Sequence, residues 1–482
     1  MKKLKDAFEL FLLFFKIGLF TFGGGYAMIS LISHEVVEKR KYLGAEEFSD
    51  VVAIAESTPG PIAINSATYI GYKRAGIFGS VMATIGVSLP SLIIIYLISL
   101  FFSKVLEYPV VNKAFQGIQC GVSILIISAG IKLMKNVKKN AISYVLTFIS
   151  FALLTVINFT SLNISTIYFV IVGAVLGVLI YYRPKKKADN GLIGEDLKNN
   201  SEENPHDKIV NADEKTADLK VEPLKGGENE EVKRKRPVKP KTIIPLAISL
   251  FVLSGLLFFG GIYKIICKDA IEILSTSNAY RYFLSVSELF ATFFKVGLFS
   301  FGGGYGMLPL MLEETVGKGW LTEAEFASFL AVAESTPGPI AINMATYVGS
   351  TQGGLYGPIG GLFGSIMATI GVIVPSLTII LLIVAVLKNF LQYKAVRAAL
   401  YGMKPVICGM ILATGFNLVM TNVFPNFDKF DFTDFGWVSL VITVVIAITA
   451  TVYKKLRKKN ASPIMLIVVS AALGILLNLN AL

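Results

Sequence analysis

Residues 14–28 read FFKIGLFTFGGGYAM, and residues 293–307 read FFKVGLFSFGGGYGM. Two further blocks return in the same order: AESTPGPIAINSATYIG (55–71) as AESTPGPIAINMATYVG (333–349), and GSVMATIGVSLPSL (79–92) as GSIMATIGVIVPSL (364–377). Three matches in one order indicate that the chain contains two copies of a single unit. The copies extend over residues 1–182 and 284–482.

The composition indicates a membrane protein. Of the 482 residues, 54% are hydrophobic and 16% are charged, which is more apolar surface than one soluble core can bury. Apolar runs long enough to cross about 30 Å of hydrocarbon occur at 76–102, 114–131, 141–159, 164–182, 242–266, 359–387, 398–420, 437–453 and 461–480. We therefore predict an all-α polytopic protein of the plasma membrane, with the lipid bilayer as its solvent.

The segment between the copies has a different character. Residues 183–241 are rich in Lys, Glu, Asp and Asn and poor in aromatic residues, which predicts a disordered linker. Residues 242–283 then hold one apolar run and a connector. A single crossing at this point inverts the second copy relative to the first.

Loop charges support this inversion. Loop 132–140 is basic where its counterpart 421–436 is acidic, and loop 454–459 is basic where 158–163 is uncharged. Because Lys and Arg accumulate in cytoplasmic loops, the N-terminus and the linker are predicted to be cytoplasmic and the C-terminus external. Inverted repeats are typical of secondary transporters, whose substrate site lies near the bilayer midplane.

Several classes of function lack support. The net charge of +12 comes from Lys and Arg beside apolar runs, so we expect no nucleic-acid partner. Three cysteines and two histidines have neither metal-ligand nor disulfide-framework spacing. With no P-loop and no nucleophile–base set, we expect neither an ATP-driven pump nor an enzyme, and no metal or cofactor. Homo-oligomerisation is left open.

The FGGG and TPGP motifs interrupt apolar stretches, which predicts broken or re-entrant helices at 7–36, 47–72, 286–314 and 325–350. A half-helix that starts at such a break directs free N–H groups and its positive dipole end into the gap, where an anion is the natural occupant. Pro61 and Pro339 suit the first helical turn. The alternative is that the glycines allow close helix packing and the prolines only kink the chain.

The candidate substrate-binding residues follow from these motifs. They are Gly23, Gly24, Gly25, Ser57, Thr58, Gly60 and Asn65 in the first copy, and Gly302, Gly303, Gly304, Ser335, Thr336, Gly338 and Asn343 in the second. The asparagines, with Tyr69 and Tyr347, can donate hydrogen bonds to oxyanion oxygens. Hydrogen bonding between helices is the alternative role for these four side chains.

Charged residues within the apolar stretches complete the candidate set. Lys16 and Lys295 are expensive to bury, so each is a candidate to bind substrate or to pair with Glu56 or Glu334; snorkelling to the headgroups is the alternative. A carboxylate beside an anion site must be protonated or paired. Glu56 and Glu334 are therefore candidates for proton coupling, with a structural Lys–Glu pair as the alternative.

At these motifs the chain resembles the chromate ion transporter family, in a fused two-domain form. The resemblance is in FGGGYAM, FGGGYGM and the two copies of ESTPGPIAIN, and it covers both repeats but not the linker. It implies export of chromate, with sulfate as a structural mimic. It assigns motif positions at Gly23–Gly25, Glu56, Pro59–Pro61 and Asn65, and at Gly302–Gly304, Glu334, Pro337–Pro339 and Asn343.

The sequence thus predicts a secondary transporter for chromate or a sulfate-like oxyanion, driven by ion coupling or exchange. An anion channel, or a transporter of a different anion such as sulfate, is the alternative. Four half-helix ends, two from each repeat, are expected to line one site, and one repeat is expected to rock against the other during transport.

Overall fold

The computed structural model describes residues 2–21, 25–137, 139–160, 162, 164–182, 278–386, 393–425, 434–458 and 461–478. The regular elements in these ranges are all helices, which confirms the all-α prediction. The predicted linker at 183–241 and the apolar run at 242–266 lie outside the described residues. The connector was expected to reach residue 283, but α12 (Asn278–Phe299) already begins at Asn278.

Seven helices in the described part of the chain are long and apolar enough to cross a membrane. They are or lie within α4 (Ile62–Leu106), α5 (Pro109–Lys135), α6 (Ala141–Phe159), α12, α16 (Pro358–Val386), α17 (Lys394–Val423) and α18 (Trp437–Arg457). Two shorter apolar helices are α7 (Thr166–Tyr182) and α19 (Pro463–Leu477). Helices α6 and α18 expose large apolar side chains such as Phe148 and Ile448, as expected of surfaces that face lipid. The chain is therefore a polytopic membrane protein.

Both repeats start with the broken helices that the sequence predicts. In the first, α1 (Lys2–Phe20) is followed by α2 (Gly25–Ser33), a π-helical turn η1 (His34–Lys39) and α3 (Ala45–Ser57). In the second, α12 is followed by a short 3-10 turn η2 (Tyr305–Met307), α13 (Leu308–Gly317) and α14 (Glu323–Ser335). Each series ends at a TPGP motif.

The helix after TPGP doubles back on itself in both repeats. Helix α4 bends at Gly76, where φ is +72°, and in the second repeat a loop separates α15 (Ile340–Gly354) from α16. Hydroxyl pairs join the two arms: Thr68 to Thr84 at 2.7 Å and Thr346 to Thr369 at 2.9 Å. Helices α4 and α16 also contact each other, which joins the two repeats.

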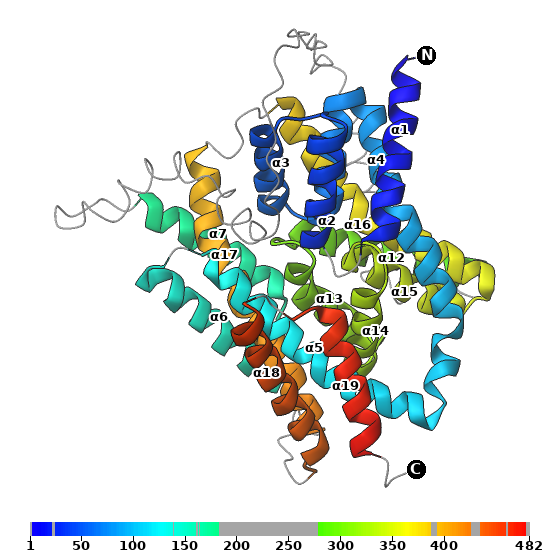
Figure 1. Cartoon of the computed structure of the whole chain (residues 1–482), viewed down its shortest axis with the longest axis vertical. Helices are drawn as coiled ribbons and strands as arrows, with labels where there is room; N and C mark the ends of the chain where they lie inside the picture. Colours follow the sequence, from blue (N-terminus) through cyan, green and yellow to red (C-terminus); the bar gives the residue numbers. More distant parts are fainter. Residues whose placement is uncertain are drawn as a thin grey trace, which may run out of the picture.

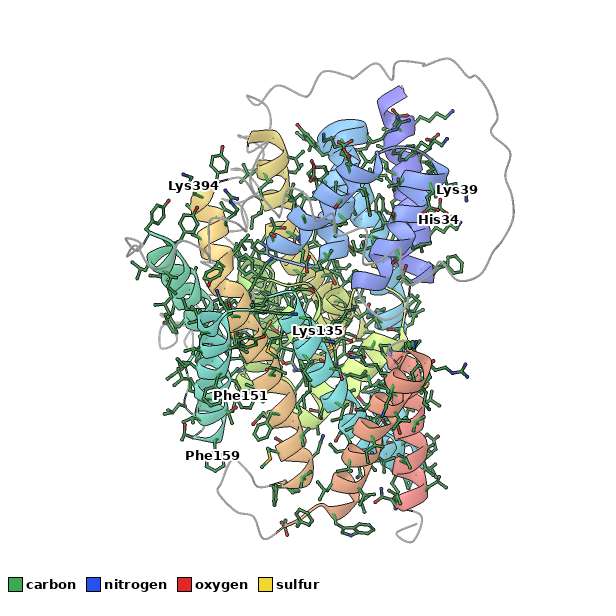
Figure 2. The ribbon with its side chains drawn as sticks, turned by 60° about the vertical axis from the view of Figure 1, so that its left-hand side comes forward. His34, Lys39, Lys135, Phe151, Phe159 and Lys394 are labelled. Carbon is green, nitrogen blue, oxygen red and sulfur yellow. The ribbon has the colours of Figure 1, made fainter. Side chains whose placement is uncertain are left out.

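The last two helices of each repeat pack mainly on the other repeat. Helices α6 and α7 contact α17 of the second repeat, and α18 and α19 contact α5 of the first. Figure 1 shows α19 beside α5, and α7 beside α17. In Figure 2, α6 with Phe151 and Phe159 runs along the orange helix α17. The two copies are interleaved, so neither forms a separate domain.

Glycines allow this exchange of helices. A Cβ atom at Gly177 of α7 would lie 2.3 Å from the carbonyl oxygen of Ala398, and one at Gly402 would lie 2.0 Å from that of Gly173. Likewise, a Cβ atom at Gly117 of α5 would lie 2.2 Å from the carbonyl oxygen of Ser470 in α19. Small residues let helix backbones approach closely in membranes, where helix packing depends on such contact.

Candidate functional site

The two TPGP motifs form matching breaks in the helical backbone. Helix α3 ends at Ser57 and α4 begins at Ile62, while α14 ends at Ser335 and α15 begins at Ile340. The motif prolines Pro61 and Pro339 therefore stand one residue before the first turn in which we expected them. They occupy the N-cap positions, with extended backbone.

The glycine of each TPGP motif is required by conformation and by space. Gly60 has φ +98° and Gly338 has φ +105°, a region that L-residues with a Cβ rarely adopt. A Cβ atom at Gly60 would lie 1.7 Å from the Oγ of Ser376, and one at Gly338 would lie 1.6 Å from the Oγ of Ser91. Each break is thus held against a serine of the other repeat.

The motif asparagines hold the breaks in shape. The amide nitrogen of Asn65 lies 3.2 Å from the carbonyl oxygen of Ala55, 3.0 Å from that of Pro59 and 3.0 Å from the Thr58 hydroxyl. Asn343 repeats this pattern in the second copy. The structure therefore shows the amide donors, which we expected to face substrate, bonded to the chain itself.

Other candidate hydroxyl and aromatic groups also have partners within the protein. The hydroxyls of Thr58 and Thr336 donate to the carbonyls of the preceding helical turn. Tyr347 stacks on Phe329 with ring centroids 3.6 Å apart. Of the two motif serines, Ser57 is buried and Ser335 is partly exposed. These contacts explain how the helices are held together at the breaks, which was the alternative role for Tyr347.

Two of the three glycines in the second FGGG motif are required by conformation, whereas Gly304 has an ordinary helical φ of −54°. Gly302 and Gly303 have φ values of +88° and +79°, and a Cβ atom at Gly302 would meet no atom closer than 3.8 Å. Close helix packing therefore does not explain Gly302, whereas the positive φ does. In the first repeat, Gly23 and Gly24 lie outside the described residues, and Gly25 is the first residue of α2.

The breaks of the two repeats meet. The N–H of Gly60 donates to the carbonyl of Ser300 at 2.9 Å, and the N–H of Gly338 donates to the carbonyl of Thr21 at 3.0 Å. A Cβ atom at Gly303 would lie 2.7 Å from the side chain of Ile62, the first residue of α4. Each TPGP break therefore contacts the FGGG break of the opposite copy.

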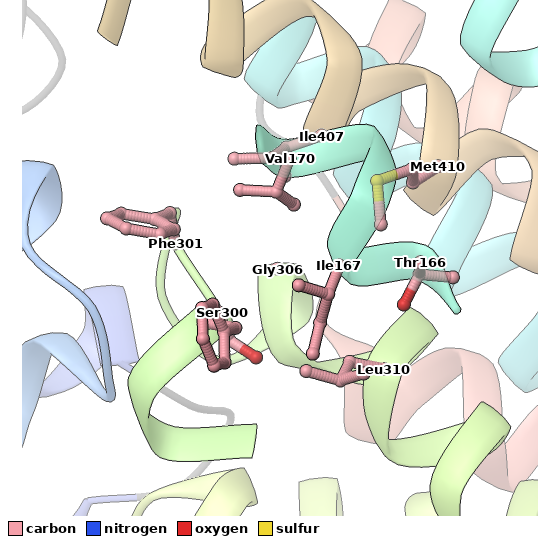
Figure 3. A pocket seen from close by; sticks show the side chains of 10 residues that line it. Thr166, Ile167, Val170, Ser300, Phe301, Gly306, Leu310, Ile407 and Met410 are labelled. Atoms are coloured by element: carbon pink, nitrogen blue, oxygen red, sulfur yellow. The ribbon is translucent and has the colours of Figure 1, made fainter. Parts of the chain in front are cut away.

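A small cavity lies beside the second FGGG break, between α7, α13 and α17 (Figure 3). Its walls are mainly apolar, with Val170, Phe301 and Ile407 among them. Two hydroxyls, of Thr166 and Ser300, also line it; both are buried, and neither makes a hydrogen bond within the described residues. Buried hydroxyls without a partner are uncommon, so this cavity, with a volume of about 10 Å³, can accept a polar guest the size of a water molecule.

The lysine of each repeat forms an ion pair that the sequence analysis did not foresee. Lys16 pairs with Glu35 at 3.4 Å, and Lys295 pairs with Glu314. The predicted Lys295–Glu334 pair was wrong, since the ion-pair partner of Lys295 in the described structure is Glu314. The repeated sequence could have predicted these ion pairs, because the lysine and the glutamate stand 19 positions apart in both copies.

The two candidate coupling carboxylates have different surroundings. Glu334 is fully buried, and the side chain of Tyr305, which the sequence analysis overlooked, lies near it. Glu56 is partly exposed. An ionised carboxylate is costly to bury, so the Glu334 site favours a neutral acid or an arriving cationic partner.

A family model described as chromate transporter matches residues 8–178 and 287–475. A chromate transport protein of Pseudomonas aeruginosa is 24% identical over 412 residues, covering 85% of this chain and 80% of its own. An uncharacterised transporter of Methanocaldococcus jannaschii is 26% identical over 355 residues, covering 73% of this chain and 71% of its own.

A chromate transport protein of Cupriavidus metallidurans is 21% identical over 350 residues, covering 72% of this chain and 68% of its own. No solved structure matches the chain. The family match covers both repeats and includes the FGGG and TPGP breaks whose geometry is described above, and the chain therefore belongs to the chromate transporter family.

Proposed function

We propose that this protein is a secondary transporter that exports chromate, or a sulfate-like oxyanion, across the plasma membrane. The observation that carries the proposal is the meeting of the breaks, in which Gly60 and Gly338 each donate a backbone hydrogen bond to the opposite repeat. Helix N-termini at such breaks present N–H groups and positive dipole ends to an anion. The chromate transport proteins among its relatives support the choice of cargo.

In this proposal the site lies between the repeats, beside the breaks at Gly60, Gly303 and Gly338. The hydroxyls of Ser300 and Thr166, which line the water-sized cavity beside the second FGGG break, serve as further donors to the oxygens of the cargo once this cavity widens during transport. The asparagines hold the breaks in shape and do not bind the anion directly. Lys16 and Lys295, each held by a glutamate, supply positive potential beside the path.

Coupling is assigned to the carboxylates that precede the breaks. Glu334, fully buried beside the side chain of Tyr305, carries a proton in this conformation, and Glu56 plays the same part in the first repeat. A proton-coupled or exchange mechanism follows. The repeats have opposite orientations in the membrane, with residue 2 and the linker on the cytoplasmic side and residue 478 outside.

The interleaved packing changes which parts move. Because α6 and α7 pack on α17, and α18 and α19 on α5, a whole repeat cannot rock as one body without breaking these contacts. We infer that two units move relative to each other. One contains the broken-helix segments around α4 and α16, and the other contains α5, α17 and the helices α6, α7, α18 and α19 that pack on them. Motion between packed units is the usual basis of alternating access.

The test is uptake of radiolabelled chromate into inverted membrane vesicles. Saturable uptake that sulfate inhibits is the expected result, and it should be lost when Lys16→Ala and Lys295→Ala are combined in a protein that still folds. Saturable uptake that persists in this variant would show that the two lysines have no charge role. Flux that never saturates and carries current would favour an anion channel, and uptake of sulfate but not chromate would reassign the cargo.

A further inference from the structure

The first repeat contains one residue more than the second between its buried glutamate and its next helix. Glu35 stands nine positions before Gly44, the N-cap of α3, whereas Glu314 stands eight positions before Thr322, the N-cap of α14. The additional residue falls where the first repeat forms the π-helical turn η1 and the second continues as α-helix. A π-turn accommodates one inserted residue, and such turns occur often at functional sites.

The insertion adds a cation. Arg40 caps the C-terminus of η1, as Lys318 caps that of α13, so these two residues are equivalent in the fold. Lys318 pairs with Glu288 at 2.9 Å, and Arg40 interacts electrostatically with Glu9, which is the equivalent of Glu288. Lys39 is then the residue without a counterpart in the second repeat.

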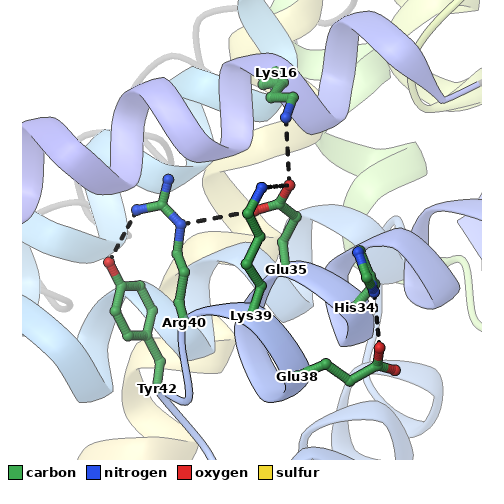
Figure 4. A network of polar contacts seen from close by, with 7 residues as sticks. All are labelled: Lys16, His34, Glu35, Glu38, Lys39, Arg40 and Tyr42. Carbon is green, nitrogen blue, oxygen red and sulfur yellow. Dashed lines mark hydrogen bonds and ion pairs between the residues drawn. The ribbon is translucent and has the colours of Figure 1, made fainter.

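This lysine joins an existing ion pair. The Nζ atoms of Lys16 and Lys39 each lie 3.4 Å from the same oxygen of Glu35, and the Nε of Arg40 lies 3.7 Å from the other oxygen (Figure 4). The Glu35 side chain is 6% exposed, whereas both lysine side chains are 58% exposed. One buried carboxylate thus holds three cationic groups side by side, with lysine N–H donors left to face outward.

The charge balance differs between the repeats. In the first, Lys16, Lys39 and Arg40 converge on Glu35, and the neighbouring Glu38 contacts His34 rather than this cluster. In the second, the equivalent region has one carboxylate for each lysine: Lys295 with Glu314, and Lys318 with Glu288. If Glu9 is included, the first cluster has three positive and two negative side chains, which leaves a net charge of +1.

We propose that Lys16, Lys39 and Arg40 form a capture site for a tetrahedral oxyanion group beside the break of the first repeat. Two ammonium groups that share one carboxylate oxygen are close enough to contact one such group together, and clustered positive charge raises the local concentration of anions. The inference rests on the proposed function, in which the side of the protein that carries this cluster faces the cytoplasm and receives the anion that is to be exported. It also makes the two repeats different in function, because the equivalent region of the second repeat has one carboxylate for each lysine.

The same chemistry is available from two sources, soluble chromate or the phosphate of an anionic lipid headgroup. Initial rates of chromate uptake are therefore measured in inside-out proteoliposomes of phosphatidylcholine alone and of phosphatidylcholine with phosphatidylglycerol. The variant is Lys39→Gln. Its matched control is Lys41→Gln, which removes the same charge two positions further along the chain from an exposed side chain.

In phosphatidylcholine alone, Lys39→Gln should raise the KM for chromate roughly two- to fivefold, the size expected of one partly exposed charge, and should weaken the dependence of KM on salt. Lys41→Gln should change neither. An effect of Lys39→Gln confined to vesicles with phosphatidylglycerol would identify the headgroup as the occupant. Equal behaviour of the two variants in both lipids would overturn the capture site.

A second measurement separates this inference from the transport proposal. The full-length protein in neutral detergent is heated with chromate, or with chloride at equal ionic strength, and its Tm is recorded. Chromate should raise the Tm of the wild type and of Lys41→Gln more than that of Lys39→Gln. Absence of uptake together with this Tm difference would refute the proposed transport but keep the capture site, whereas equal Tm shifts would refute the capture site.

Discussion

The backbone N–H of Gly60 donates to the carbonyl of Ser300 across 240 positions of sequence, at 2.9 Å. Its counterpart joins Gly338 to Thr21 at 3.0 Å. Because each bond links a TPGP break to the FGGG break of the other copy, the two repeats complete each other's breaks. Any motion that separates the repeats at this point must break both bonds.

Gly60→Ala and Gly338→Ala should each abolish chromate uptake and lower the Tm. A left-handed backbone costs a residue with a Cβ about 1–2 kcal/mol, and the added atom would also overlap the Oγ of Ser376 or Ser91. Gly317→Ala is the control, since it has no atom within 4 Å of its added Cβ. A Gly60→Ala protein with normal uptake would contradict the described geometry.

Asn65→Ala should destabilise the protein by roughly 1–3 kcal/mol, because buried carbonyls at the break lose their donor. The measurement is thermal unfolding in detergent, compared with Asn112→Ala, which removes an exposed amide side chain that holds no break. If Asn65 instead contacted the cargo, the variant would keep its Tm and show a higher KM.

Glu334→Gln should flatten the dependence of uptake on pH, because the amide mimics a permanently neutral acid. The protein should remain as stable as the wild type, since the amide has nearly the same shape as the buried carboxylate and can still bond to the side chain of Tyr305. Uptake is measured across a range of pH, with Glu107→Gln as a control at an exposed carboxylate away from the breaks. An unchanged pH profile would remove Glu334 as the proton carrier.

Ser300→Ala should raise the KM for chromate several-fold with little change in Tm, because its hydroxyl has no partner in the described structure that removal would disrupt. Thr449→Val is the control: it removes a hydroxyl that bonds within its own helix, far along the chain in α18. A fall in Tm without any change in KM would give Ser300 a structural role only.

The interleaved helices lead to a prediction about assembly. Residues 1–200 and 201–482, expressed separately, should each be degraded, because α6–α7 and α18–α19 lose the helices on which they pack. Expressed together, they should copurify and transport chromate. Stable, monodisperse protein from residues 1–200 alone would show that the first repeat is an independent domain, contrary to the contacts between α7 and α17.

The sequence alone determined the repeat, the membrane class and the position of the four breaks. These follow from local composition: apolar runs of bilayer length, and Gly or Pro motifs that interrupt them, such as TPGP around Gly60 and FGGG around Gly303. The family resemblance carried by these motifs was confirmed by the match over both repeats. The inverted orientation, read from loop charges, stays a prediction.

Only the tertiary structure decided the partners of the site residues. Lys295 was placed with Glu334 as one option, yet it pairs with Glu314, and Asn65 turns its amide to the backbone. Nor did the sequence reveal that α7 packs on α17, or that Ser376 faces Gly60. Such contacts join residues far apart in the chain, and they depend on how whole helices pack, which local composition and periodicity do not encode.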